Sequence, residues 1–457
     1  MSITSIAVTV ESAARLSSRA KALHAGGAID TTRRFASNIA VSAASRLSSR
    51  AKALHAGGGA AASVWEKMNA IAARAGMVNM SQGFPDFPGS SVARDAASVA
   101  MATGDAASNQ YSPQPGLLAL RESVSAFYDR RHGVTYDPAS EVVVTAGGQE
   151  GLAAAFLAYL NPGDEVVCVE PFYPFMLGAI LNAGAIPRVV TLEPPDFALP
   201  EAALREACAS PKAKMLVLNT PHNPTGKVAT PQELEMVASA CVENDLLAVA
   251  DEVYEHCVFP STTPVGSTST ATAAAAHRRL AAAPGMAERT ITIGSGGKLF
   301  ALTGWRVAWA TGPAELLAPL GRAHTHMTFS APTPLQLGVA AALDVEDGLE
   351  EVAPLFASNW RKLATALEEG HTPVAEVCAA EGGYFLVART DGTPDMEFCE
   401  NLAESAGVVA TPMSVFYTTP FTEEEPCTLV RFTICKSKEH VERACERIVS
   451  PPHSWSA

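Results

Sequence analysis

Seven short apolar runs recur through the middle of the chain, and segments with helical spacing of apolar residues separate several of them. The runs are Glu141–Thr145, Glu165–Glu170, Arg188–Leu192, Lys214–Asn219, Leu246–Asp251, Thr290–Gly294 and Arg306–Ala310. Near-continuous apolar strands that alternate with helices, such as Pro231–Glu243, indicate a sheet covered by helices on both faces. The pattern therefore predicts an α/β fold with a seven-stranded, mostly parallel sheet. Ligands of such sheets bind beyond the carboxyl ends of the strands.

The chain before these strands is predicted to contain helices and shaped loops. Helical spacing of apolar residues predicts helices over Val64–Ala75 and Leu117–Tyr128. Glycine and proline mark loops at Ser81–Gly89 and Asn109–Gly116, where regular structure is disfavoured. Gly83 in the first loop can let a ligand approach the backbone closely.

The pattern changes again from about Asp344, where a helix over Leu355–Leu367 is followed by strands near Gly382–Val387 and Leu429–Cys435. This arrangement predicts a second, smaller α+β domain. A run rich in Ser, Thr and Ala around Thr262–Ala276 interrupts the order of the first domain and predicts a surface insertion. The predicted segments are 1–62, 63–110 (an arm and part of the small domain), 111–343 (the large domain, with the insertion at 262–285) and 344–457 (the small domain).

Residues 1–62 differ from the rest of the chain in composition. They hold eight Lys and Arg side chains against two acids, are rich in Ala and Ser, and contain one 13-residue sequence twice, at Arg15–Gly27 and Arg46–Gly58. Basic, acid-poor, serine-rich ends are typical of organelle transit peptides, for a mitochondrion or a plastid. The alternative is a disordered tail that carries no targeting signal, on a cytoplasmic protein.

Charge and cysteine usage narrow the functional classes. The whole chain carries a formal charge of −14, so the part after residue 62 carries −20 (−14 minus +6). Such an acidic body argues against nucleic acid as a partner. No apolar run is long enough to span a bilayer. The nine cysteines are scattered without metal-ligand spacing, which predicts reduced thiols and no metal site.

Polar residues follow the predicted strands at the edge where a ligand is expected. The strand Glu141–Thr145 runs through glycines into a helix, so the backbone N–H groups of Gly147, Gly148 and Gln149 can cradle a phosphate. Asn223 lies in a Pro/Gly turn after another strand, Lys214–Asn219. Each of these features alone is often only a turn.

Lys298 lies between two strands and is flanked by small residues, with Ser295 and Arg306 nearby in the sequence. A lysine alone is usually a solvated loop residue. An amine beside residues that can clamp a phosphate is, however, what pyridoxal phosphate (PLP) requires. Asp251 at another strand end can face the ring nitrogen and keep it protonated, which makes the ring an electron sink.

Three further residues suit the same cofactor. Tyr173 can stack on the ring, and Asn223 and Tyr254 can hydrogen-bond its phenolate oxygen. Arg431 is a charge inside an apolar strand, and its planar fork suits the α-carboxylate of an amino acid. A structural ion pair with a nearby glutamate is the alternative reading of Arg431.

Eight motifs together resemble the class I/II aminotransferases, and within them most closely the kynurenine/glutamine/methionine branch. They are SQGFPDFP, NQYSP, TAGGQEG, EPFYP, NTPHNPTGK, DEVYE, SGGKLFALTGWR and VRFTICK, spread over about Val64 to Ile448. The resemblance implies PLP fold type I and a homodimer in which two subunits share each active site. Three departures are Ala308 where the family usually has glycine, the insertion at Thr262–Ala276, and the N-terminal repeat.

The resemblance also implies a role for each matched residue. Lys298 would be the Schiff-base lysine, Asp251 the partner of the pyridine nitrogen, Asn223 and Tyr254 the partners of the phenolate, and Tyr173 the ring-stacking residue. The phosphate would be held by Gly148, Gln149, Ser295 and Arg306, with Tyr111 from the neighbouring subunit. The substrate carboxylate would be held by Gly83, Asn223 and Arg431.

These roles predict a ping-pong transamination between an amino acid and a 2-oxo acid, with Lys298 as the general base. The alternatives are a PLP-dependent lyase acting on cysteine S-conjugates and a PLP-binding regulator without chemistry. We expect neutral or aromatic donors of the methionine, glutamine, phenylalanine or kynurenine type, because no second arginine is evident for an acidic side chain. The stretch Arg322–Ser330, with His324, His326 and Phe329, is expected to help line the side-chain pocket.

Overall fold

The computed structural model describes residues 46–103, 106–260, 277–370, 372–418 and 420–453. The first copy of the N-terminal repeat and the predicted insertion at Thr262–Ala276 lie outside these residues. The chain divides into two compact units, 1–52 and 53–457. The first is described only over its last residues, where helix α3 (Ser49–Ala72) begins, and the second contains all the features below.

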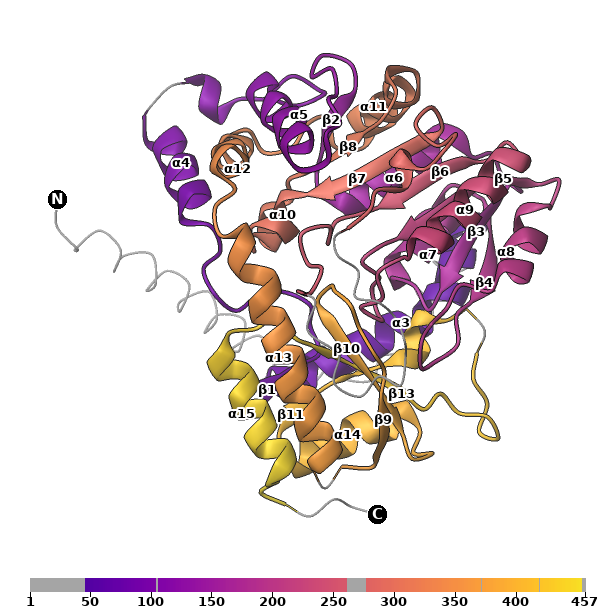
Figure 1. The fold of residues 1–457 in the computed structure, drawn as a ribbon, viewed down its shortest axis with the longest axis vertical. Coiled ribbons are helices and arrows are strands. Elements are labelled where there is room, and N and C mark those ends of the chain that lie inside the picture. The colour runs from indigo at the N-terminus through magenta and orange to yellow at the C-terminus, as the bar shows by residue number, and fades with distance from the viewer. Residues whose placement is uncertain (1–45, 104–105, 261–276, 371, 419, 454–457) are drawn as a thin grey trace, which may run out of the picture. The chain divides into compact units, whose positions relative to one another are not determined.

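The second unit is built around a seven-stranded sheet, which Figure 1 shows in magenta and salmon with its strands labelled. Its order is β2 (Val142–Thr145), β8 (Ala308–Thr311), β7 (Thr290–Ser295), β6 (Leu247–Asp251), β5 (Ala213–Asn219), β3 (Glu165–Glu170) and β4 (Ile186–Thr191). β8 alone runs antiparallel to its neighbours, β2 and β7. All seven predicted strands are present, which confirms the predicted fold class.

Helices cover both faces of this sheet because its strands are apolar on both faces. Val166 and Cys168 of β3 belong to a core shared with α6 (Gly148–Tyr159) and α7 (Pro174–Asn182). Val167 and Val169 belong to a second core. Burying one such side chain contributes about 1.5–3 kcal/mol. The helices of the second core are α8 (Glu201–Cys208) and α9 (Pro231–Glu243), and a third core joins β2 and β8 to α5 (Leu118–His132) and α12 (Thr333–Val345).

Local sequence signals fix several helix ends. Thr230 caps α9 by accepting a hydrogen bond from the Glu233 N–H at 3.1 Å, while the Glu233 side chain accepts one from the Thr230 N–H at 2.9 Å. Pro231 occupies the first turn, where no N–H partner is needed. This reciprocal cap explains why α9 begins where predicted, at Pro231.

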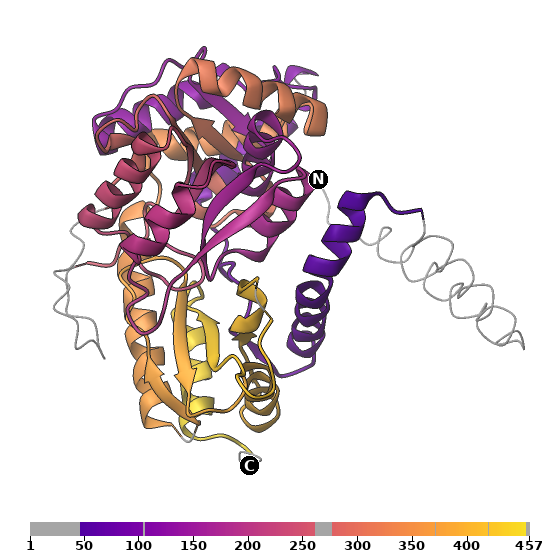
Figure 2. The same cartoon turned by 90° about the vertical axis from the view of Figure 1, so that its right-hand side faces the viewer.

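The C-terminal part of the chain forms a four-stranded antiparallel sheet, in orange and yellow in Figure 2. Its order is β12 (Thr411–Pro412), β13 (Leu429–Thr433), β10 (Phe385–Thr390) and β9 (Val374–Val377). Helices α13 (Leu349–Glu369) and α14 (Asp395–Ser405) pack against it, and α15 (Lys438–Val449) packs against α13. This smaller α+β arrangement was predicted, and it also contains the short parallel pair β1 (Val78–Asn79) and β11 (Val408–Val409).

Several predicted boundaries shift. Arg306 lies outside β8 because its backbone adopts the left-handed region (φ 55°). The strand predicted from Gly382 begins at Phe385, since Gly383 has φ 74°. Helix α3 begins well before Val64 and ends at Ala72. The remaining elements are α4 (Ser91–Ala102), α10 (Gly296–Leu299), α11 (Ala314–Thr328) and the 3-10 turns η2 (Ala106–Asn109), η3 (Leu280–Ala282), η4 (Thr303–Trp305) and η5 (Met413–Phe416).

Among the described residues, no helix combines the length and the apolar character that a membrane crossing requires.

Candidate active site

The carboxyl ends of the parallel strands meet at one edge of the large sheet. The register pairs Asn219 of β5 with Asp251 of β6, and Asp251 in turn with Ile293 of β7. The loops and helix starts that follow these strands therefore lie next to one another. They carry the polar residues singled out in the sequence, from Gly148 after β2 to Lys298 after β7.

A cavity of about 400 Å³ opens at this edge. Eleven of the twelve predicted site residues line it, namely Gly83, Gly148, Gln149, Tyr173, Asn223, Asp251, Tyr254, Ser295, Lys298, Arg306 and Arg431. The twelfth, Tyr111, is 82% exposed and packs edge-on against Phe329 outside this cavity.

Lys298 lies within the short helix α10, which begins directly after β7. Its Nζ atom donates to the Gly83 carbonyl oxygen at 3.4 Å and lies 5.3 Å and 5.2 Å from the ring centres of Tyr254 and Tyr384. The Tyr384 hydroxyl donates to the Lys298 carbonyl oxygen at 2.7 Å and so fixes the backbone there. Burial lowers the pKa of Lys298 from its usual value, which favours the neutral, nucleophilic amine.

Asp251, at the end of β6, has a buried Oδ1 atom without a hydrogen-bond partner among the described residues. Burial raises the pKa of Asp251 to about 7, against the lowering influence of the Val253 backbone and of Lys298. A buried carboxylate oxygen of this kind is costly unless a donor or a cation meets it. The site is therefore suited to a ligand that presents a charged N–H group to Asp251.

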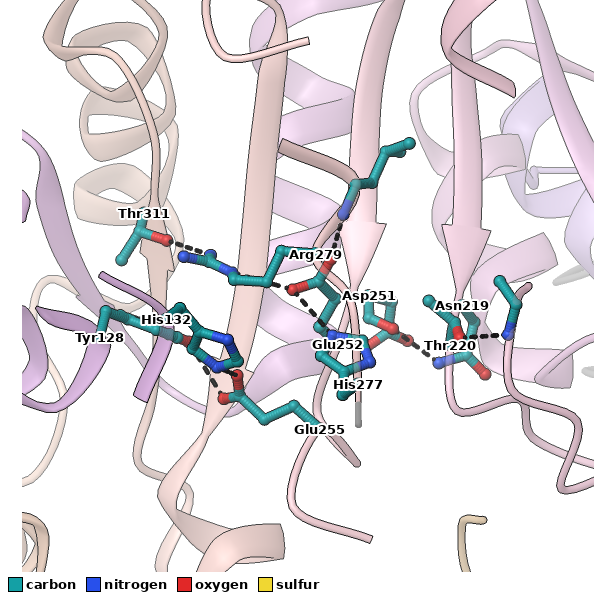
Figure 3. Close-up of polar contacts among 12 residues, drawn as sticks. Tyr128, His132, Asn219, Thr220, Asp251, Glu252, Glu255, His277, Arg279 and Thr311 are labelled. Atoms are coloured by element: carbon teal, nitrogen blue, oxygen red, sulfur yellow. Dashed lines mark hydrogen bonds and ion pairs between the residues drawn. The ribbon is translucent and has the colours of Figure 1, made fainter. Parts of the chain in front are cut away.

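The next residue, Glu252, is fully buried but is satisfied by the protein itself (Figure 3). It accepts from the Arg279 Nε atom at 3.1 Å and from the Leu280 backbone N–H at 3.0 Å, and His277 lies 3.3 Å away. Although burial opposes it, the interactions with His277 and Arg279 lower the pKa of Glu252 to about 2. This cluster anchors the end of β6 and thereby holds Asp251 in place.

Two positive features meet at the N-terminus of α6. Gly147 precedes the helix with φ 94°, and no side chain caps the free N–H groups of the first turn. A Cβ atom on Gly147 would lie 2.2 Å from the Arg306 guanidinium, so glycine is needed for this close approach. Arg306 has no ion-pair partner among the described residues. Its Nη1 atom donates to the Thr303 carbonyl oxygen at 3.2 Å, so the charge itself is not neutralised. A helix N-terminus next to such a guanidinium is a strong anion site, and a phosphate fits it.

Arg431 enters the cavity from β13. Its side chain is only 3% exposed, and it donates to the Asn223 Oδ1 atom at 2.8 Å and to the Ser81 carbonyl oxygen at 3.2 Å. Burial lowers the pKa of Arg431 to about 9. No carboxylate pairs with it among the described residues, so the structural ion pair considered from the sequence is not found. Its unpartnered Nε atom suits a ligand carboxylate.

The expectation that the stretch Arg322–Ser330 helps line the pocket is wrong for the cavity of this chain. No residue of Arg322–Ser330 lines the cavity. His324 is buried on α11 with Nδ1 3.0 Å from the Glu150 carboxylate, because the helix turns this side chain toward α6. Nine unpredicted residues do line the cavity, and they are Trp65, Asn69, Gln82, Phe84, Leu152, Phe175, Asn219, Val253 and Phe385.

Some of these nine carry a signal in the sequence, and others do not. Gln82 and Phe84 flank Gly83 in the loop already singled out, and Asn219 opens the turn that contains Asn223, whose backbone N–H it accepts at 2.7 Å. Trp65 lies on α3, far from these motifs in the sequence, and its helical spacing alone indicates only a packed face.

Comparison with known families identifies the class of protein. Residues 75–448 match the aminotransferases of class I and II. The chain belongs to this family. It is therefore a PLP-dependent transaminase, as the resemblance of its sequence motifs implied.

Three relatives of this aminotransferase illustrate the range of the family. The probable N-succinyldiaminopimelate aminotransferase of Mycobacterium tuberculosis is 41% identical over 85% of this chain and 96% of its own length. A solved structure of an N-succinyldiaminopimelate aminotransferase from that organism superimposes with a TM-score of 0.76, covering 84% of this chain and 96% of that chain at 40% identity. The methionine aminotransferase of Escherichia coli is 33% identical over 84% of this chain and 95% of its own length. Human kynurenine–oxoglutarate transaminase 1 is 31% identical over 84% of this chain and 94% of its own length.

The residues present in this aminotransferase fit PLP. Asp251 offers an unpartnered oxygen to a protonated ring nitrogen, and Lys298 offers the amine. The glycine turn before α6 and Arg306 offer the anion site for the phosphate. Among the described residues, no group of three or more His, Cys, Asp or Glu side chains is placed to hold a metal ion.

Proposed function

We propose that this aminotransferase moves the amino group of a neutral or aromatic amino acid, of the kynurenine, methionine, glutamine or phenylalanine type, to a 2-oxo acid. The supporting observation is the cationic content of the cavity. The cations that line it are Lys298, Arg306 and Arg431, and each already has a place at the amine, the phosphate or the α-carboxylate. None is left among the described lining residues for a second carboxylate of the donor.

The remaining wall of the cavity suits an uncharged side chain. It is formed largely by Trp65, Phe84, Phe175 and Phe385. Aromatic faces bury apolar and aromatic groups with a gain of about 0.5–1.5 kcal/mol per ring pair beyond area burial. Neutral polar donors can use the amide groups of Asn69 and Gln82 at the same wall.

The roles of the protein residues follow from the contacts above. PLP, when bound, supplies the carbonyl group that exchanges with the amino group and a ring that withdraws electrons from the substrate Cα. Arg431 and Asn223 orient the substrate carboxylate. The Lys298 Nζ atom is the base that takes the proton from the substrate Cα, because its buried position favours the neutral amine. Asp251 remains ionised beside the ring nitrogen that it holds protonated.

The experiment is a panel of amino donors with several 2-oxo acid acceptors, read as kcat/KM. Kynurenine, methionine, glutamine and phenylalanine should exceed aspartate and glutamate by at least about tenfold, since an unpaired second carboxylate costs more than 1.4 kcal/mol in an apolar pocket. Preference for aspartate or glutamate would contradict the proposal. Pyruvate and ammonia released from a cysteine S-conjugate without any acceptor would instead support the lyase alternative.

A second candidate donor is N-succinyldiaminopimelate, which the name of the 41% identical relative suggests. It belongs in the same panel. Its distal carboxylates need cationic partners that the described lining residues do not provide beyond those already assigned. A kcat/KM for this donor above that of every neutral donor would establish the second candidate in place of the first.

We also propose that the enzyme is a homodimer in which Tyr111 completes the phosphate site of the other subunit. Tyr111 is 82% exposed beside the exposed Phe329, which is unusual for two large aromatic side chains. Light scattering should give twice the chain mass, and Tyr111→Phe should weaken PLP binding without changing that mass. A monomer with full activity would contradict this assignment.

Residues 1–62 remain a proposed transit peptide on their composition. A reporter fused to them should enter a mitochondrion or a plastid. A diffuse cytosolic signal would contradict the proposal.

A further inference from the structure

Lys436 is a buried ammonium group outside the cavity, and the mechanism above does not use it. It follows β13 and is only 2% exposed. The Asn359 side chain holds its backbone by donating to the Lys436 carbonyl oxygen at 2.9 Å. Among the described residues, no carboxylate forms an ion pair with its Nζ atom. Burying an ammonium group without a counter-charge is costly, so its presence calls for a role beyond filling space.

Among the described residues, the hydrogen bond and the ring contact of the ammonium group both involve Phe84, in the loop Ser81–Gly89. The Lys436 Nζ atom donates to the Phe84 carbonyl oxygen at 2.6 Å and lies 3.9 Å from the centre of the Phe84 ring. A cation over an aromatic face is attracted by the ring, most strongly where water is excluded. Lys436 therefore fixes both the backbone and the side chain of Phe84.

Phe84 is part of the cavity wall, and its position in the loop links it to Lys298. The preceding carbonyl oxygen, that of Gly83, accepts a hydrogen bond from the Lys298 Nζ atom at 3.4 Å. Two lysines thus hold two consecutive carbonyl groups. Lys298 must leave Gly83 whenever its amine reacts, whereas Lys436 takes no part in the chemistry and can keep its contact throughout.

The far end of the same loop is tied to the same segment. Asp86 accepts from the Ser437 backbone N–H at 2.5 Å and from its hydroxyl at 3.1 Å, and its carboxylate lies 3.0 Å from the His440 Nδ1 atom. Residues 436–440, which do not line the cavity, therefore hold residues 84–86 in place. Asp86 also interacts electrostatically with Lys436, whose hydrogen bond and ring contact are with Phe84.

We propose that Lys436 is a positioning residue that holds Phe84 against the donor side chain and so sets the affinity of the enzyme for its amino donor. The inference rests on the proposed function in one respect, since Phe84 is taken to contact an uncharged donor side chain. It needs no particular donor for its test, because the readout is made with the best donor of the wild-type enzyme, whichever that is.

The test compares Lys436→Met and Lys436→Arg, with Lys438→Met as the matched control on the exposed start of α15. Methionine fills the space without charge, so KM for the donor should rise about tenfold while kcat changes less than about threefold. The visible absorbance of bound PLP should stay the same, and the melting temperature should be unchanged or higher, since a buried unpaired charge is removed. Arginine keeps a donor and a cation, so it should return KM to within about threefold of wild type.

A merely structural Lys436 predicts the opposite result, a lower melting temperature with unchanged KM in the folded fraction, and that result would overturn the proposal. Phe84→Leu tests the same contact from the loop and does not depend on how well the Lys436 variants fold. It should raise KM with kcat retained. The fold-increase in KM caused by Lys436→Met should be at least about twofold smaller in the Phe84→Leu background than in the wild-type background. The same fold-increase in both backgrounds would contradict the assignment.

The donor panel and the Lys436 variants test the two proposals independently of each other. A preference for acidic donors would contradict the proposed substrate class, and the effect of Lys436→Met on KM could still be measured with the preferred donor. A normal KM in Lys436→Met with a neutral donor would sink the positioning role and leave the substrate class intact.

Discussion

Asp251 and Glu252 are neighbours in the chain, and burial acts on both carboxylates, yet their pKa values move in opposite directions. The pKa of Asp251 is raised to about 7, and that of Glu252 is lowered to about 2. The difference lies in the partners. Glu252 faces Arg279, His277 and a backbone N–H group, whereas the Asp251 Oδ1 atom faces the cavity without a partner among the described residues.

This contrast separates a structural charge from a functional one. A buried charge that the protein satisfies by itself stabilises the fold and leaves nothing for a ligand. A buried polar atom that the protein leaves unpaired is costly until a ligand meets it, so an atom of this kind on a side chain that lines a cavity marks a binding site. Asp251 and the Arg431 Nε atom are of the second kind, and both belong to side chains that line the same cavity.

The largest expected effect is the loss of activity in Asp251→Asn. The amide cannot balance the positive charge of a protonated ring nitrogen, and removing one partner of a buried pair costs about 3–5 kcal/mol. Turnover should therefore fall by roughly 10²–10³-fold. Steady-state transamination with excess PLP measures it, and the melting temperature should not fall. Near-normal turnover of Asp251→Asn would contradict the functional role assigned to Asp251.

Glu252→Gln should do the reverse and affect the fold. It leaves the Arg279 guanidinium buried without a counter-charge, so the free energy of unfolding should drop by about 3–5 kcal/mol. Urea unfolding measures this change. Turnover per folded molecule should stay within about threefold of wild type. Lost turnover in a fully stable variant would show that Glu252 also takes part in the chemistry.

Arg431→Met should reduce kcat/KM for amino donors by about 100-fold. The guanidinium is placed to give charge-assisted hydrogen bonds to the substrate carboxylate, each of which contributes about 1.5–3 kcal/mol. Arg389→Met provides a control, because Arg389 lies on β10 and is half-exposed beside Glu376. Equal effects of the two substitutions would show that Arg431 acts only through the fold.

The smallest effect concerns the stability of the PLP-free protein against pH. A carboxyl group whose pKa rises from its ordinary value of 3.8 to about 7 on folding binds a proton more tightly when folded. Its contribution to stability therefore declines as pH rises from about 4 to about 7, by about 2 kcal/mol after allowance for partial exposure. The Glu252 contribution is lost at the other end, as pH falls from about 4.5 towards 2.

Unfolding measured along this pH range should show the decline in the PLP-free wild type. Asp251→Asn should abolish it. A decline of equal size in both proteins would assign it to other groups.

Much of this site could be predicted from the sequence, because its parts follow apolar strands whose ends must meet. Polar or aromatic residues stand at or just after the ends of such strands, and they include Lys298, Asp251, Asn223 and Tyr173. The parallel register then brings them together without any further information. The predicted sheet needed only the alternation of strands with helices such as Pro231–Glu243.

Other features could not be predicted because they depend on contacts between distant segments. Trp65 reaches the cavity from α3, and only the packing of that helix decides which of its side chains face inward. Lys436 reads as an ordinary polar residue after a strand until its contact with Phe84 is known. Asp251 and Glu252, the first two of the three acids of the DEVYE motif, look equivalent in sequence, since Arg279 is far away along the chain. His324 was expected at the cavity, but the turn of α11 points it to Glu150.

The most direct test of the central assignment is to fix bound PLP to the amine that holds it. Borohydride reduction of the purified enzyme, followed by digestion and mass spectrometry, should give one modified peptide, with the added mass on Lys298. Lys298→Ala should lack this modification and nearly all turnover, while Lys438→Ala should keep both. Label on another lysine, or a protein that stays colourless after incubation with PLP, would contradict the account.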